Sequence, residues 1–386
     1  MLQSFIFQEV NQEDNFEAST ISEAVAARYE TKYGFLETKN QPYYQSLDME
    51  LDLYPNDRKA TYSIQANLAN ISTQAIDSLY LNLPEKTTLR MLHILGTSLK
   101  PLKVDQEHDV YSFLLPRSLD SGQVARVDMQ MEKDFEGFTQ GDPQASLVYK
   151  GSFASVDDYL PRIGYDRNQL LTSNRTRAAH GLPKIQSILP PIAQQHLPPE
   201  NIYRSDAQMI QGTLTISTSS DQLPIGPGRI EESWKEQGRQ YTRFEVDKRG
   251  PLNWYMGSAP YAMAEGQNAS IYYHPGHDYN LDIYEEALMQ SMRFVEDHLG
   301  TYPHSQVRLY EVPRYHEEIH HFASGIAISE REGWVADTSG LKERAYLRYT
   351  VATGVVSHWI QSHLNIARVQ GAEMLRVALP EALAMA

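Results

Sequence analysis

The hydrophobic pattern of the chain changes near Pro275. Before this position, apolar and polar residues alternate in short runs separated by turn residues, which is typical of strands with one buried face. Such runs occur at Leu47–Leu53, Tyr62–Leu68, Ser78–Leu83, Val110–Leu115, Val124–Met131, Leu147–Tyr149, Thr213–Thr218, Tyr241–Val246 and Ser270–Tyr273. Many short strands joined by turns favour an antiparallel β saddle or sandwich.

After Pro275, apolar residues recur at helical spacing over Tyr279–Leu299 and Leu341–Leu364, with a strand-like run at Val307–Val312 between them. A separate helix is predicted near the N-terminus, at Ala18–Leu36. The Pro-, Gln- and Arg-rich segment 166–201 is predicted to be a long surface loop.

These patterns together predict an α+β multidomain protein. Its expected parts are a helical leader over residues 1–45, an antiparallel β-domain over 46–274 and a partial α/β domain over 275–386.

Composition narrows the classes of function. The 386-residue chain has a formal net charge of -15, which disfavours general binding to nucleic acids because their phosphate backbones are also negative. It contains no cysteine, which excludes disulfides, thiolate nucleophiles and cysteine-ligated zinc. The N-terminal sequence lacks the features of a signal peptide, and no apolar run reaches the roughly 18 residues of a membrane span. We expect the chain as given to be soluble, while its compartment stays open.

A literal His-Glu-x-x-His motif begins at His316. On a helix, His316 and His320 would share one zinc ion, with Glu317 as the general base. The motif, however, follows a strand-like run and precedes another. In an extended chain the two histidines would lie roughly 13 Å apart, too far for one ion. We interpret the motif as a polar segment and keep His316, His320 and Glu317 as a rival metal site.

A second histidine-rich segment runs from His274 to Asp278, with His277 between them. It is open to two interpretations, a metal or acid/base site and a turn between domains. We favour the turn, because Asp278 would act as the N-cap of the following helix.

Several stretches resemble the alanyl-aminopeptidase (gluzincin) family of zinc peptidases, most closely the form fused behind the permease of bacterial ABC transporters. The matching stretches are Leu51–Pro55, Val148–Phe153, Leu160–Tyr165, His180–Pro183, Ile271–Asp282, Val307–Tyr315, Ile328–Asp337 and Val369–Leu375. The resemblance implies an N-terminal β saddle followed by part of a thermolysin-like catalytic domain.

The resemblance also locates the family's zinc helix, because Trp359 and the Val-Gln-Gly-Ala stretch match without a gap. Thr353 then stands at the first zinc-binding histidine, Gly354 at the general-base glutamate, Ser357 at the second histidine and Val377 at the third ligand. All four positions have lost the family's side chain, so the metal motif is degenerate and we expect no zinc there. The family's catalytic tyrosine would lie beyond the end of the chain.

The family's substrate-binding strand corresponds to residues 318–322. Glu318, His320, His321 and Phe322 are therefore candidates for substrate binding by resemblance. The literal His-Glu-x-x-His motif overlaps this strand rather than the zinc helix.

These observations leave three alternative functions. The first is a noncatalytic module that binds a peptide or protein, or is structural. The second is an active zinc aminopeptidase that uses the rival site. The third is a piece of a transporter-associated peptidase, whose partner would be a membrane protein and would keep the chain at the membrane. Self-association is expected through a C-terminal apolar patch formed by Trp359, Ile360, Met374, Leu375 and Leu379.

Overall fold

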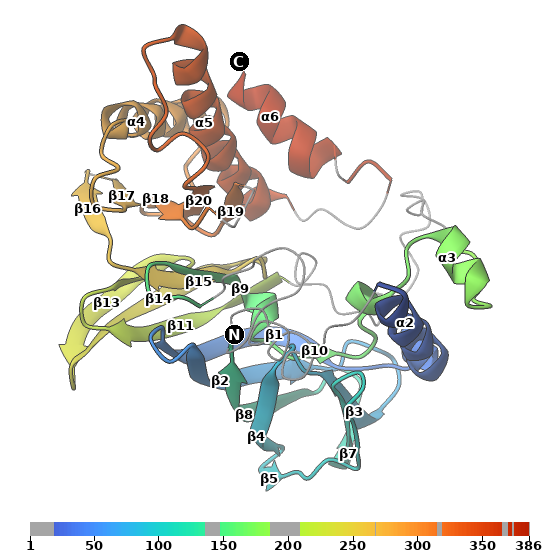
Figure 1. Ribbon diagram of the computed structural model, residues 1–386. Helices are drawn as coiled ribbons and strands as arrows, with labels where there is room; N and C mark the ends of the chain where they lie inside the picture. Colours follow the sequence, from blue (N-terminus) through green and yellow to red (C-terminus); the bar gives the residue numbers. More distant parts are fainter. Residues whose placement is uncertain are drawn as a thin grey trace, which may run out of the picture. The chain divides into compact units, whose positions relative to one another are not determined.

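The computed structural model describes residues 19–135, 147–185, 209–266, 268–314, 319–364, 370–372 and 374–385. The chain divides into two units: residues 1–47, 61–143 and 157–208 form the first, and residues 48–60, 144–156 and 209–386 form the second. The fold is mixed α+β, with many strands and few helices (Figure 1). Among the described residues, no helix combines the length and the apolar run that crossing a membrane requires.

The first unit contains two groups of strands, and the pairings described within them are antiparallel. One has the order β2-β8-β4-β5, and the other has the order β10-β3-β7-β6. Their bounds are Lys59–Ala69 (β2), Val124–Asp134 (β8), Thr87–Ile94 (β4), Thr97–Ser98 (β5), Arg162–Ile163 (β10), Ile76–Asn82 (β3), Val110–Leu119 (β7) and Lys103–Asp105 (β6). β1 (Tyr43–Tyr54) and β2 each have residues in both units.

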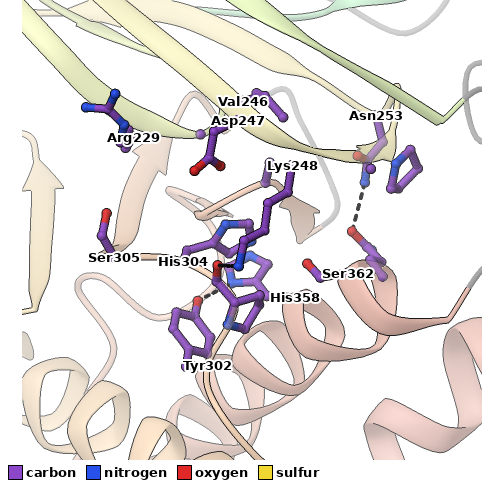
Figure 2. Close-up of a pocket in the computed structure, with 16 residues that line it drawn as sticks. Arg229, Val246, Asp247, Lys248, Asn253, Tyr302, His304, Ser305, His358 and Ser362 are labelled. Carbon is purple, nitrogen blue, oxygen red and sulfur yellow. Dashed lines mark hydrogen bonds between the residues drawn. The ribbon is translucent and has the colours of Figure 1, made fainter. Parts of the chain in front are cut away.

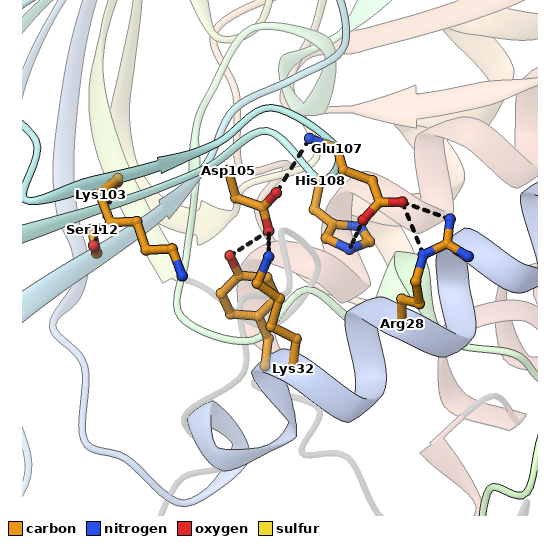
Figure 3. Close-up of polar contacts among 8 residues, drawn as sticks. Arg28, Lys32, Lys103, Asp105, Glu107, His108 and Ser112 are labelled. Atoms are coloured by element: carbon orange, nitrogen blue, oxygen red, sulfur yellow. Dashed lines mark hydrogen bonds and ion pairs between the residues drawn. The ribbon is translucent and has the colours of Figure 1, made fainter.

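The predicted N-terminal helix is confirmed as α2 (Ser19–Tyr33), which packs into the first unit. The hydroxyl group of Tyr29 donates to Asn82 Oδ1 at 2.9 Å and accepts the amide N–H of Asp166 at 2.8 Å. On the same helix, Lys32 Nζ lies 2.5 Å from Asp105 Oδ2, as Figure 3 shows. The buried tyrosines and these polar contacts hold the helix in place.

The segment predicted as a loop over 166–201 contains a helix, α3 (Asn174–Ala179), so that part of the prediction was wrong. The reason is a buried ion pair: Arg177 Nη1 lies 2.7 Å from Glu30 Oε2, and both side chains are almost fully buried. Short 3-10 turns lie at Gly34–Glu37, Val156–Asp158 and Arg167–Gln169.

The second unit contains three further groups of strands, with orders β13-β14-β11, β12-β15-β9 and β16-β17-β18-β20-β19. The first two are antiparallel, whereas β17, β18 and β20 are parallel neighbours. Their bounds are Met209–Ser219 (β11), Leu223–Ile225 (β12), Arg229–Glu236 (β13), Arg239–Pro251 (β14), Tyr255–Ala259 (β15), Ser152–Ser155 (β9), Ala262–Glu265 (β16), Ala269–Tyr273 (β17), Val307–Val312 (β18), His320–Phe322 (β19) and Gly325–Ser329 (β20).

Two helices cover the five-stranded sheet and were both predicted from apolar spacing: α4 (Leu281–His298) and α5 (Leu341–His363) (Figure 1). Their inner faces form one core with β17, β18 and β20, centred on residues such as Leu288, Leu309 and Val351. Every residue of β18 is buried, which fits the central position of a strand with parallel neighbours. A π-helical turn (Met374–Ala378) and α6 (Leu379–Ala384) follow.

Two other expectations were wrong. Leu147–Tyr149 is a bend and turn rather than a strand. Ile360 belongs to the core with 1% of its surface exposed, so it does not contribute to the expected apolar patch, whereas Trp359 and Leu379 are partly buried against that core. Exposed apolar side chains do occur nearby, at Met374, Leu375 and Val377.

Candidate functional site

Helix α5 touches strands β19 and β20 at Gly354. A Cβ atom built on this glycine would lie 2.6 Å from Ile326 Cδ1 and 3.2 Å from His321 Cδ2. A separation of 2.6 Å is far shorter than the roughly 3.5–4.0 Å at which two carbon atoms pack, so any side chain at this position would displace Ile326. Gly354, which the resemblance places at the general-base position, therefore packs closely against β20 and against His321 of the strand that resembles the substrate strand.

The three positions at which the resemblance places zinc ligands, Thr353, Ser357 and Val377, supply no side chain that suits zinc. Thr353 Oγ1 donates to the backbone carbonyl of Tyr349 at 2.9 Å, and the Ser357 side chain is buried in the helix interface. Val377 lies in the π-helical turn with 51% of its surface exposed. Zinc sites in proteins use imidazole, thiolate or carboxylate ligands, so these residues do not fit a zinc ion.

His358 follows Ser357 on α5 and fixes the helix against its neighbours. Its Nδ1 lies 2.6 Å from the Tyr302 hydroxyl group, and its Nε2 lies 2.9 Å from the Gly325 carbonyl oxygen. A neutral imidazole satisfies both contacts, since Nε2–H donates to the carbonyl while Nδ1 accepts the tyrosine O–H. Burial lowers the pKa of His358 to about 4, in keeping with the neutral form. His358 is therefore a packing residue with both nitrogens engaged.

Strand β19, at the end of the five-stranded order, carries the described part of the proposed substrate strand. The His321 carbonyl accepts a hydrogen bond from Asn253 Nδ2 at 2.9 Å, while its ring Nε2 is buried without a partner. Burial lowers the pKa of His321 to about 3. Phe322 is fully buried next to it.

The ring of His320 lies 4.5 Å from that of Tyr255 and 5.5 Å from that of Phe153, so it belongs to an aromatic cluster. Of the literal motif, only Ile319 and His320 are described, and His320 begins strand β19. His316, Glu317 and Glu318 lie outside the described residues, so a metal shared by His316 and His320 stays an untested hypothesis.

A cavity of about 350 Å³ lies between β14, the loop at 302–305 and the end of α5 (Figure 2). Arg229, Asp247 and Lys248 are among its lining residues, and the guanidinium group of Arg229 is paired with Glu245. Lys248 Nζ donates to the Pro303 carbonyl at 3.1 Å. Burial lowers the pKa of His304, which also lines the cavity, to about 3. Its walls come from distant segments with no shared motif, so sequence reasoning missed it.

The histidine-rich segment contains a turn, with the amide of His277 donating to the His274 carbonyl at 2.9 Å, but the helix cap differs from the one that we expected. α4 begins at Leu281 and its N-cap position is Asn280, so the expected cap at Asp278 was wrong. The side chain of Asn280 does not cap the helix; its Nδ2 donates to the Gly333 carbonyl at 2.8 Å. His277 points instead at a buried glutamate, Glu311, with 2.5 Å between His277 Nδ1 and Glu311 Oε1.

Comparison with known proteins identifies the fold. No family profile and no curated protein matches the sequence. A solved mutant of a two-domain M1 zinc metallopeptidase, bound to L-arginine, matches with a TM-score of 0.58 and 12% identity over 89% of this chain and 70% of that chain. An M1 zinc metallopeptidase from Deinococcus radiodurans, solved both as such and as a mutant, matches with a TM-score of 0.56 and 12% identity over 89% of this chain and 71% of that chain. The chain therefore has a two-domain M1 peptidase-like fold, and this low identity establishes the fold alone.

Proposed function

We propose that this protein uses a peptidase-like fold to bind a peptide or an extended protein segment without cleaving it. The observation that carries the proposal is the contact of Gly354 with Ile326 and His321, because it fills the place where metal-assisted hydrolysis would need a general base. Hydrolysis of this kind needs a metal ion to activate water and polarise the carbonyl group. Thr353, Ser357 and Val377 supply no ligand for that ion.

Within this proposal, the strands before Pro275 correspond to the family's N-terminal β saddle. The five-stranded sheet with α4 and α5 corresponds to part of its thermolysin-like domain. The support is the match to two-domain structures and the parallel core β17-β18-β20 beneath two helices.

Binding is supported by what surrounds the closed contact. β19 is the last strand in its sheet order, and an extended peptide is able to add to such an edge. The cavity at the end of α5 has the size of a small-ligand or side-chain pocket. The ammonium group of Lys248 at the cavity favours an acidic side chain of the bound segment, whereas Arg229 is already paired with Glu245.

The proposal is tested by the binding of fluorescein-labelled extended peptides with acidic, neutral or basic residues, measured by fluorescence anisotropy. Ser362→Trp places an indole in the cavity and is expected to weaken binding of the acidic peptides at least tenfold. Ser339→Trp, on an exposed site before α5, is the matched control and is expected to leave binding unchanged. Absence of binding by the wild-type protein, or equal binding by both variants, would reject the cavity as the site. Association with a transporter stays a prediction.

A further inference from the structure

One imidazole and two carboxylates come together in the second unit, on elements other than α5. One ligand atom from each of His277, Glu311 and Glu330 lies within 4.8 Å of the other two. His277 precedes α4, Glu311 lies on β18 and Glu330 directly follows β20. Because β18 and β20 are parallel neighbours, Glu311 and Glu330 meet where these two strands end.

Glu311 is held rigidly and is fully buried. The backbone N–H of His274 donates to Glu311 Oε2 at 2.7 Å, and the hydroxyl group of Tyr261 donates to the Glu311 backbone carbonyl at 2.6 Å. Both carboxylate oxygens are therefore engaged, Oε2 with the His274 amide and Oε1 with His277 Nδ1 at 2.5 Å. Outer hydrogen bonds of this kind orient carboxylate ligands in metal sites.

The charges also favour a cation at this position. A buried carboxylate next to a second carboxylate is unfavourable unless positive charge lies beside both. The His277 imidazole offers at most a single positive charge for two glutamates. A divalent cation would balance both carboxylates and would accept a ring nitrogen of His277 as a ligand.

We propose that His277, Glu311 and Glu330 bind one zinc ion. Imidazole nitrogen and carboxylate oxygen both suit Zn²⁺, which accepts three protein ligands and a water molecule. Ligand atoms about 2.1 Å from a tetrahedral ion lie about 3.4 Å from each other, so the 2.5 Å contact between His277 and Glu311 would open to admit the ion. The side chain of His277 is 26% exposed, which gives an ion access from solvent.

The site would act as a brace within the second unit, because it ties the turn before α4 to the ends of β18 and β20. An ion that binds the folded chain but not the unfolded chain raises the free energy of unfolding in proportion to the logarithm of the ion concentration. This inference does not depend on peptide binding, and it assigns no catalytic step to the ion.

The test begins with full-length protein stripped of metal by a chelator, followed by calorimetric titration with Zn²⁺, and with Mn²⁺, Ca²⁺ and Mg²⁺ separately. We expect one equivalent of Zn²⁺ to bind more tightly than the other ions and to raise the melting temperature. Glu330→Gln and His277→Ala should each weaken zinc binding at least tenfold, whereas His298→Ala, an exposed histidine on α4, should not. A misfolded variant is recognised by its circular dichroism, and Glu330→Gln is the milder change because it keeps the side-chain shape.

No zinc binding by the wild-type protein would overturn the proposal. So would unchanged binding in both ligand variants, or equal weakening in His298→Ala. Tighter binding of Ca²⁺ or Mg²⁺ than of Zn²⁺ would also contradict it, because those ions select oxygen ligands alone.

Discussion

A Cβ atom on Gly354 would lie 2.6 Å from the Cδ1 atom of Ile326, so α5 and β20 meet at a point where a larger residue would displace that isoleucine. In the fold of zinc peptidases, this is the position where the resemblance places the general base. Because glycine occupies this contact, the helix has no carboxylate at the position where the resemblance places the general base.

The first prediction concerns this contact. In an unconstrained helix, replacing glycine by alanine stabilises by about 1 kcal/mol. Here Gly354→Ala is expected to lower the free energy of unfolding by about 1–3 kcal/mol, because the added methyl group overpacks the core. The measurement is urea denaturation followed by circular dichroism.

Ile326→Val is the matched partner, because it removes the Cδ1 atom that the new methyl group would meet. The double variant should lose less stability than the two single changes added together. A stabilising effect of Gly354→Ala alone would show that the contact is looser than described.

The second prediction concerns the buried ion pair of Glu30 and Arg177. Arg177→Ala should lower the free energy of unfolding by about 3–5 kcal/mol, because it leaves the buried carboxylate of Glu30 without its partner. Arg28→Ala is the control. Arg28 lies on α2, as Glu30 does, but it pairs with Glu107 at the surface, as Figure 3 shows. That change should cost no more than about 1 kcal/mol. Similar losses in both variants, measured by urea denaturation, would contradict the assignment of α3 as an anchored helix.

The third prediction concerns pH. Burial lowers the pKa of His358 to about 4, whereas an unfolded histidine titrates near its ordinary value of 6.5. Between these values the unfolded chain binds the extra proton, so the free energy of unfolding falls as the pH falls. The slope from His358 alone should be about 1.4 kcal/mol per pH unit.

The measurement for this prediction is urea denaturation at pH values from 7 down to about 4.5. His358→Gln should make the curve shallower between about pH 6 and pH 4.5. His363→Gln, at the exposed end of α5, should leave the slope unchanged. An unaltered slope in His358→Gln would show that this histidine is not buried in its neutral form.

The elements that could be predicted from the sequence are those whose buried residues recur at one regular spacing. α4 and α5 have apolar stripes, and β8 alternates buried and exposed positions along nearly its whole length. β13 was missed because both of its faces are largely exposed and polar, so it has no apolar period to detect. It pairs with β14 in a hairpin whose two-residue turn is Gln237-Gly238, so the local signal was a turn rather than an apolar period.

The candidate sites were predicted less completely, because they depend on contacts between distant segments. The resemblance located Gly354 and His321 in separate stretches, but only the structure shows that they touch. Glu311 looked like one polar residue in an apolar strand, and its pairing with His277 joins residues that are 34 positions apart. Spacing within one motif carries no information about such pairs.

The most direct test of the central claim is hydrolysis of aminoacyl-nitroanilide substrates by the purified protein, with added zinc and with a chelator. The account predicts no turnover above the protein-free reaction in either condition, because α5 supplies neither a zinc site nor a general base. Turnover that requires zinc would contradict it. If that turnover survived Thr353→Ala and Ser357→Ala but disappeared in His316→Ala, the protein would be an aminopeptidase that uses the rival site.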